Sequence, residues 1–139
     1  MRGFLYHNFM KAYISVSFNQ RENFESITQT INQTLINHSI NPFVFVDHYK
    51  FDLSEEKEMM QTAIDDIKSS QLLIAETSDK GIGIGIEVGY AKALNIPIIY
   101  LRNKNAEHST TVAGISDYQI IYNNETELTE KLTAILKLL

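Results

Sequence analysis

The chain alternates short apolar runs with longer segments in which apolar residues recur every three or four positions. The short runs are rich in β-branched residues and predict strands, whereas the longer segments have the spacing of amphipathic helices. We expect strands over residues 12–17, 42–46, 72–75, 97–101 and 118–122. We expect helices over residues 22–37, after an N-cap at Ser54, at about 84–94 and over 126–138.

Strands that alternate with helices favour a parallel sheet, because each right-handed crossover places a helix on one face of the sheet. We therefore expect an α/β protein: a flavodoxin-like three-layer sandwich around a five-stranded parallel sheet. Residues 11–139 form a single domain in this interpretation, and residues 1–10 form an N-terminal extension. In such sheets ligands bind beyond the carboxyl ends of the strands, which points to the loops at 17–21 and 77–87.

The most distinctive local pattern places glycine at alternate positions before an acid: Gly81, Gly83 and Gly85 precede Glu87. We interpret it as a flexible loop whose glycines allow close approach to a ligand, with Glu87 in the first turn of the following helix. The helix dipole there favours an ionised carboxylate, which suits a nucleophile. The glycine spacing matches neither the dinucleotide-binding fingerprint nor a phosphate-binding loop with its lysine.

Composition narrows the classes of chemistry. The 139 residues include no cysteine, which excludes disulfides, thiolate nucleophiles and cysteine-bound zinc. The four histidines are scattered, and we expect neither a metal nor a cofactor. The net charge of −5 argues against a nucleic-acid polymer as partner. With no long apolar run and no signal-peptide pattern, we expect no membrane partner and a soluble, cytoplasmic protein.

The segment from Glu87 to Ile99, EVGYAKALNIPII, resembles the signature of the nucleoside 2-deoxyribosyltransferase family, including its 2'-deoxynucleoside 5'-phosphate N-hydrolase branch. The segment from Tyr13 to Ser17, YISVS, resembles the family's first strand. The resemblance extends from Lys11 to the C-terminus and implies a small-molecule substrate, a deoxynucleoside or deoxynucleotide. It also implies that Glu87 attacks the anomeric carbon of the deoxyribosyl group, as in retaining glycoside hydrolysis.

The resemblance also implies phosphate contacts. Ser17 and Ser109 fall where the hydrolase branch has serines that contact the 5'-phosphate, the second from a neighbouring subunit. A homo-oligomer, a dimer or larger, is therefore expected. Without the resemblance, Ser17 is equally typical of a helix-entry turn, and Ser109 of an N-cap for a helix from Thr110.

Two positions depart from the family pattern. Ala63 stands where the family has an aspartate on the preceding helix, and Gly81 where it has a serine or an aspartate. Asp79 is the candidate replacement acid. The remaining candidates for substrate contacts are Tyr13 on the first strand, Asn19 in the loop that follows it, and Asp47 at the end of the second strand.

Aromatic residues follow the second strand: Tyr49 and Phe51 could stack on a base or could pack on their own loop. The expected activity is that of an N-glycosidase or a deoxyribosyltransferase. Two alternatives stay open: a nucleotide-binding or sensing module that has lost turnover, and a glycohydrolase of a larger nucleotide such as NAD.

Overall fold

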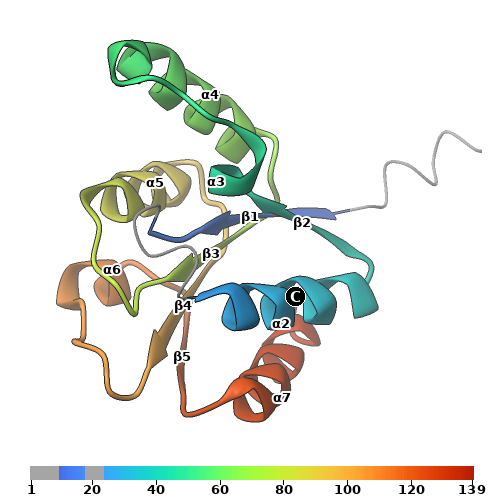
Figure 1. Cartoon of the computed structure of the whole chain (residues 1–139). Coiled ribbons are helices and arrows are strands. Elements are labelled where there is room, and N and C mark those ends of the chain that lie inside the picture. Colours follow the sequence, from blue (N-terminus) through green and yellow to red (C-terminus); the bar gives the residue numbers. More distant parts are fainter. Residues whose placement is uncertain (1–9, 18–23) are drawn as a thin grey trace, which may run out of the picture.

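The computed structural model describes residues 10–17 and 24–139 and contains a five-stranded, all-parallel sheet with the strand order β2-β1-β3-β4-β5. The strands are β1 (Met10–Ser15), β2 (Ile40–Val44), β3 (Leu72–Glu76), β4 (Ile98–Asn103) and β5 (Tyr118–Tyr122). The helices are α2 (Glu25–Asn37), α3 (Phe45–His48), η2 (Leu53–Glu55), α4 (Glu56–Lys68), α5 (Ile82–Ala93), α6 (Thr110–Gly114) and α7 (Glu125–Leu136). The α/β, flavodoxin-like architecture expected from the sequence is confirmed (Figure 1).

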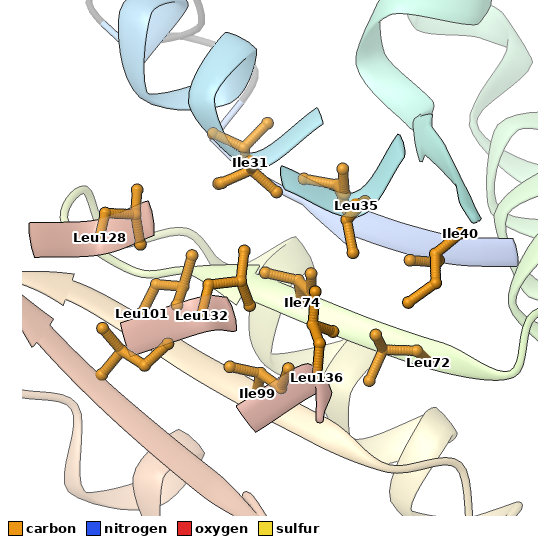
Figure 2. Close-up of a cluster of buried hydrophobic side chains, with 14 of the residues drawn as sticks. Ile31, Leu35, Ile40, Leu72, Ile74, Ile99, Leu101, Leu128, Leu132 and Leu136 are labelled. Atoms are coloured by element: carbon orange, nitrogen blue, oxygen red, sulfur yellow. The ribbon is translucent and has the colours of Figure 1, made fainter. Parts of the chain in front are cut away.

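Helices cover both faces of the sheet (Figure 1). On one face, α2 and α7 pack against alternate residues of the strands, with Ile31 and Leu132 fully buried (Figure 2). On the other face, α4 and α5 pack against the remaining alternate residues, which include Tyr13 and Leu73. The central strand β3 is buried along its whole length, as its continuously apolar sequence predicts.

The second strand is displaced from its predicted position. It begins at Ile40, before Pro42, and ends at Val44, where Phe45 starts the short helix α3. Proline has no backbone N–H to donate, but β2 is an edge strand in which only one side pairs. The strand therefore tolerates Pro42, which the sequence suggested as its first residue.

The predicted cap before α4 is also displaced: the N-cap position of α4 is Glu55, and the side-chain cap belongs to the preceding turn η2. Ser54 was the predicted N-cap, but it lies inside the 3-10 turn η2. Asp52 takes the capping role instead: its side chain accepts from the backbone N–H of Glu55, whose own side chain accepts from Asp52 N at 2.7 Å. This reciprocal capping box satisfies two donors where a serine cap satisfies one.

The glycine run is helical, which corrects the expectation of a flexible loop. Helix α5 begins at Ile82 after an N-cap at Gly81, and no described glycine has a positive φ. Glycine disfavours helices, but Ile84 and Val88 stack one turn apart on the buried face of α5. Burial of that face outweighs the weak helix propensity of the run.

Candidate active site

Glu87 lies in the second turn of α5, and both oxygens of its carboxylate are hydrogen-bonded to strand β1. Oε1 accepts from Ser15 Oγ at 2.5 Å, and Oε2 accepts from the hydroxyl of Tyr13. Because both donors come from a central strand, they hold the carboxylate on a rigid part of the fold. A carboxylate fixed in this way is preorganised for attack or for charge stabilisation.

The alternation of β1 explains why its hydroxyls reach Glu87. Side chains two residues apart on a strand share a face, so Tyr13 and Ser15 both point to the α5 side, while Ala12 and Ile14 point to the α2 side. Tyr13 is fully buried and Ser15 is 2% exposed. Their hydrogen bonds to Glu87 therefore do not compete with bulk water.

The electrostatics of Glu87 differ from the sequence prediction. Burial raises the pKa of Glu87, and the hydrogen bonds from Ser15 and Tyr13 lower it without cancelling that rise. The prediction placed Glu87 in the first turn, where the helix dipole favours ionisation, and this is wrong because α5 starts earlier. The two hydroxyls, more than the helix terminus, stabilise the ionised form. Burial and the adjacent carboxylate also raise the pKa of Tyr13, which keeps it a proton donor in a hydrogen bond.

Glu87 opens onto a cavity of about 550 Å³. Its walls come from the end of β1, from the segment that joins β2 to α4, from one face of α4 and from the start of α5. The larger apolar and aromatic side chains in its lining are Phe45, Tyr49, Phe51, Leu53, Met59, Met60, Ile82 and Ile84. A cavity of this size, with an apolar wall and a few polar groups, is typical of a small-molecule site.

Ala63 lines this cavity and is 1% exposed. The side chain of Asp66, three residues later, lies 3.6 Å from Lys11 Nζ and not in the cavity lining. Neither aspartate of α4, Asp65 or Asp66, therefore belongs to the cavity lining, where the family pattern places one. The α4 carboxylate that does line the cavity is Glu56, which the sequence analysis did not single out.

Six of the remaining predicted residues line one of two cavities, or both. Ser17, which is buried, and Gly83 line the cavity that holds Glu87. Asp79, Gly85 and Ser109 line a second cavity of about 430 Å³, and Gly81 lines both.

Two predicted residues line neither cavity. Asp47 is exposed on α3 and belongs to neither lining. Asn19 lies outside the described residues.

Ser109 makes the contacts of a helix cap. Its Oγ accepts from Val112 N at 3.4 Å, and its backbone N–H donates to the hydroxyl of Tyr100 at 3.0 Å. The N-cap alternative considered for this serine is therefore present in the structure. Ser109 also lines the second cavity, so capping and a ligand contact are compatible.

Sequence reasoning missed two groups of this site. Ser15 shares a strand face with Tyr13, and the period of two along β1 could have identified it. Glu56 precedes Ala63 by seven residues, which returns to the same face of a helix, and this spacing could have identified it too.

Two kinds of feature, a metal-binding cluster and a membrane-spanning helix, were sought in residues 10–17 and 24–139. This part of the chain contains no cluster of three or more histidine, aspartate and glutamate side chains suited to a metal ion. Nor does it contain a helix with the length and apolar character needed to cross a bilayer.

Comparison with known proteins supports the resemblance seen in the sequence. The family model described as nucleoside 2-deoxyribosyltransferase matches residues 13–132. A Syntrophotalea carbinolica protein, whose name proposes a 2'-deoxynucleoside 5'-phosphate N-hydrolase, is 35% identical over 79 residues, which are 57% of this chain and 54% of that protein. The chain thus spans about half the length of this curated relative.

Solved structures share the fold. A 2-deoxyribosyltransferase from Bacillus psychrosaccharolyticus superposes with a TM-score of 0.70 at 14% identity, covering 91% of this chain and 95% of that one. A CMP N-glycosidase from Clostridium botulinum has a TM-score of 0.62 at 22% identity, covering 89% and 98%. At these identities the likeness concerns the fold.

Proposed function

Because the chain belongs to the nucleoside 2-deoxyribosyltransferase family, we propose that it cleaves the N-glycosidic bond of a 2'-deoxynucleoside or its 5'-monophosphate. The observation that carries the proposal is the Glu87 carboxylate, held through both oxygens beside a cavity of about 550 Å³. The names of the Syntrophotalea relative and the Clostridium neighbour both describe cleavage of a nucleotide at this bond. They support the reaction class.

In the first step a Glu87 oxygen bonds to C1' of the sugar while the C1'–N bond breaks. The bonding electrons leave with the base, which takes up a proton from solvent. The product is a deoxyribosyl ester of Glu87, formed through an oxocarbenium-like transition state. A deoxyribose lacks the 2-hydroxyl group, so its cation forms more readily than that of a ribose.

In the second step water attacks C1' from the opposite side, the ester bond breaks, and its electrons return to the Glu87 carboxylate. The water gives up one proton to solvent. If a nitrogen of a second base attacks instead, the same intermediate yields a new nucleoside. Hydrolysis and transfer thus share the role of Glu87 and differ in the acceptor.

Tyr13 and Ser15 have a positioning role in both steps. They donate to the two oxygens of Glu87 and favour its ionised form before attack. When one oxygen is esterified, the other keeps its hydroxyl donor. The carboxylate therefore stays oriented throughout the cycle.

A 5'-phosphate has two groups of possible ligands. Ser17, at the carboxyl end of β1, and the backbone around Gly81 and Gly83, at the start of α5, line the same cavity as Glu87. Ser109 belongs to the second cavity, and the family resemblance has it reach the phosphate of a neighbouring subunit. This arrangement motivates the proposal of a homo-oligomer.

The exposed face of α5 supports such an assembly. Ile82 and Ile86 lie one turn apart and are 86% and 52% exposed. An apolar surface beside the cavity is typical of a subunit interface. Sedimentation at micromolar concentration should show an assembly in the wild type and monomers after Ile86→Lys. A wild-type monomer would remove both the oligomer and the role of Ser109.

A binding module without turnover is the second candidate, and Ala63 is the observation that favours it. An alanine cannot move a proton, and its neighbours on the cavity side of α4 are Met59 and Met60. This module would bind deoxynucleotides through the same cavity but would release no base.

Chromatography of released base separates the two candidates. The protein is incubated with deoxynucleosides, their 5'-monophosphates, ribonucleotides and NAD. We expect release from a deoxy substrate, and a loss of about a thousandfold or more in Glu87→Gln, because the amide is a poor nucleophile. Glu130→Gln, an exposed carboxylate of α7, is the matched control. Saturable binding of deoxynucleotide without any release would leave the binding module.

A further inference from the structure

Four charged side chains line the Glu87 cavity, and three of them already form hydrogen bonds or ion pairs within the protein. They are Asp52, Glu56, Lys80 and Glu87. Asp52 caps η2, Lys80 pairs with Glu107, and Glu87 is held by β1. Glu56 has no hydrogen-bond or ion-pair partner among the described residues. Its carboxylate is therefore available to a molecule in the cavity.

Glu56 lies on the cavity side of α4 by helical spacing. The α4 residues in the lining are Glu56, Met59, Met60 and Ala63, the pattern i, i+3, i+4 and i+7 of one helix face. With a rise of 1.5 Å per residue, Glu56 lies about 10 Å along the axis from Ala63. Glu56 therefore lies at the N-terminal end of the cavity face of α4, and the rest of that face, Met59, Met60 and Ala63, is apolar.

Aromatic rings connect the Glu87 region with the segment before α4: the ring of Phe45 lies 6.0 Å from that of Tyr13, which donates to Glu87, and Phe51 directly precedes the cap Asp52. The ring centroids of Phe45 and Tyr49 are 5.0 Å apart, and those of Phe45 and Phe51 are 6.4 Å apart. All three rings line the cavity, and their flat apolar surfaces suit a nucleobase. With the sugar at Glu87, a base against these rings extends away from C1' and turns its far edge towards the N-terminal end of α4.

We infer that Glu56 is a specificity-determining residue, and that its carboxylate accepts a hydrogen bond from an exocyclic amino group on the far edge of the base. The inference rests on the proposed function. An ionised carboxylate only accepts hydrogen bonds, so it pairs with the amino group of cytosine or adenine. It repels the carbonyl group that uracil and hypoxanthine carry at the equivalent position. The substrate class is thus a deoxynucleotide with an amino-bearing base.

Matched substrate pairs test this inference. The ratio of kcat/KM for deoxycytidine against deoxyuridine monophosphate, and for deoxyadenosine against deoxyinosine monophosphate, should favour the amino-bearing base. In Glu56→Gln the ratio should fall by about tenfold or more, because the amide loses the negative charge and can donate to a carbonyl. Most of the change in the ratio should come from a lower kcat/KM for the substrates with amino-bearing bases.

Glu58→Gln is the matched control, since Glu58 and Glu56 are both exposed on the first turn of α4 but only Glu56 lines the cavity. It should leave both ratios as in the wild type. The ratio of dissociation constants for the same monophosphates, measured by calorimetry, provides a readout that needs no turnover. It should fall in Glu56→Gln as well.

The two levels of the proposal fail differently. If base is released but Glu56→Gln keeps the wild-type ratios, or lowers both members of each pair equally, the role of Glu56 is wrong and the reaction stands. If no base is released, the proposed reaction is wrong, and the binding ratios alone decide whether Glu56 selects the base.

Discussion

In the proposed reaction Glu87 has to be ionised to attack carbon, yet its carboxylate is packed against β1. Burial raises its pKa, and the hydroxyls of Ser15 and Tyr13 oppose that rise by donating to both carboxylate oxygens. At the scale of single residues, these two hydroxyls offset part of the desolvation that comes with a preorganised site. The hydroxyls of the strand, and not the helix terminus, favour the ionised form of Glu87.

Ser15→Ala should therefore raise the pKa of Glu87 further. Because the proposed attack needs the ionised carboxylate, activity should be lost as pH falls through its pKa, and the acidic limb of the kcat/KM profile should move to higher pH. At neutral pH the rate should fall by about tenfold to a hundredfold, the usual effect of one hydrogen bond to a charged group. A pH–rate profile measures both changes.

Ser15→Thr, which keeps the hydroxyl, is the control and should restore most of the profile. A Ser15→Ala enzyme whose rate falls equally at every pH would show that the serine acts only through packing.

At the scale of elements, α5 is a helix built from a sequence with weak helix propensity. Gly83, Gly85 and Gly89 all have space for a Cβ atom, with no other atom within 4 Å of its ideal position, and none has a positive φ. Their conformation therefore does not require glycine. The three glycines differ in their distance from the site: Gly83 lines the Glu87 cavity, Gly85 lines the second cavity, and Gly89 lines neither.

Gly89→Ala should thus stabilise the fold by about 0.5–1 kcal/mol, because alanine favours the helix. Its turnover should match the wild type. Gly83→Ala should stabilise the fold by a similar amount but raise KM, because its methyl group enters the cavity. Chemical denaturation and steady-state kinetics measure the two effects. A destabilised Gly89→Ala would mean that another subunit occupies the space beside α5.

The end of β3 contains a second buried carboxylate, Glu76, which is 1% exposed. Its oxygens accept from the hydroxyl of Tyr122 at 2.6 Å and from Ser78 N at 2.5 Å. This network joins β3 to β5 and anchors the segment that leads to the candidate site. Burial raises the pKa of Glu76 above its ordinary value despite these hydrogen bonds.

A carboxyl whose pKa is raised on folding stabilises the protein fully below its unfolded pKa, and this contribution is lost as pH rises through the folded pKa. Relative to the wild type, Glu76→Gln should therefore gain stability as pH increases through that range. Urea denaturation at a series of pH values gives the difference in unfolding free energy. An equal difference at every pH would contradict the role of Glu76 ionisation, and Glu130→Gln again provides the exposed control.

At the scale of the whole molecule, the sheet separates an apolar core on one face from the candidate site on the other. The α2 and α7 face is an apolar core in which Leu132 is fully buried, whereas the opposite face contains the cavity beside α4 and α5. A change in the first core should therefore alter stability without altering the chemistry of the site.

Leu132→Ala should lower the unfolding free energy by about 2–5 kcal/mol, the usual cost of a cavity in a packed core. The kcat/KM per folded molecule should stay close to the wild-type value at a temperature where the variant is folded. Leu138→Ala is the control, because Leu138 is 71% exposed and should change stability by about 0.5 kcal/mol or less. Thermal unfolding of the two variants side by side tests the separation of the two faces.

The periodicity of the chain was sufficient to predict the order of the strands along the chain and the sheet architecture, because these depend on residues close together in the chain. Element ends were less predictable: Asp52 and not Ser54 caps the helix segment before α4, and the glycine run is helical. Both outcomes depend on hydrogen bonds and burial that compete with local propensity.

The sequence by itself determined the fold class and the family of this protein, since apolar spacing and a contiguous motif survive without knowledge of contacts. Only the tertiary structure decided what surrounds Glu87. Its partner Tyr13 is 74 residues away in the chain, Asp79 and Ser109 line a different cavity, and Glu56 joins the cavity from another helix. Ionisation and recognition depend on such long-range neighbours, because burial and hydrogen bonding act through space and not along the chain.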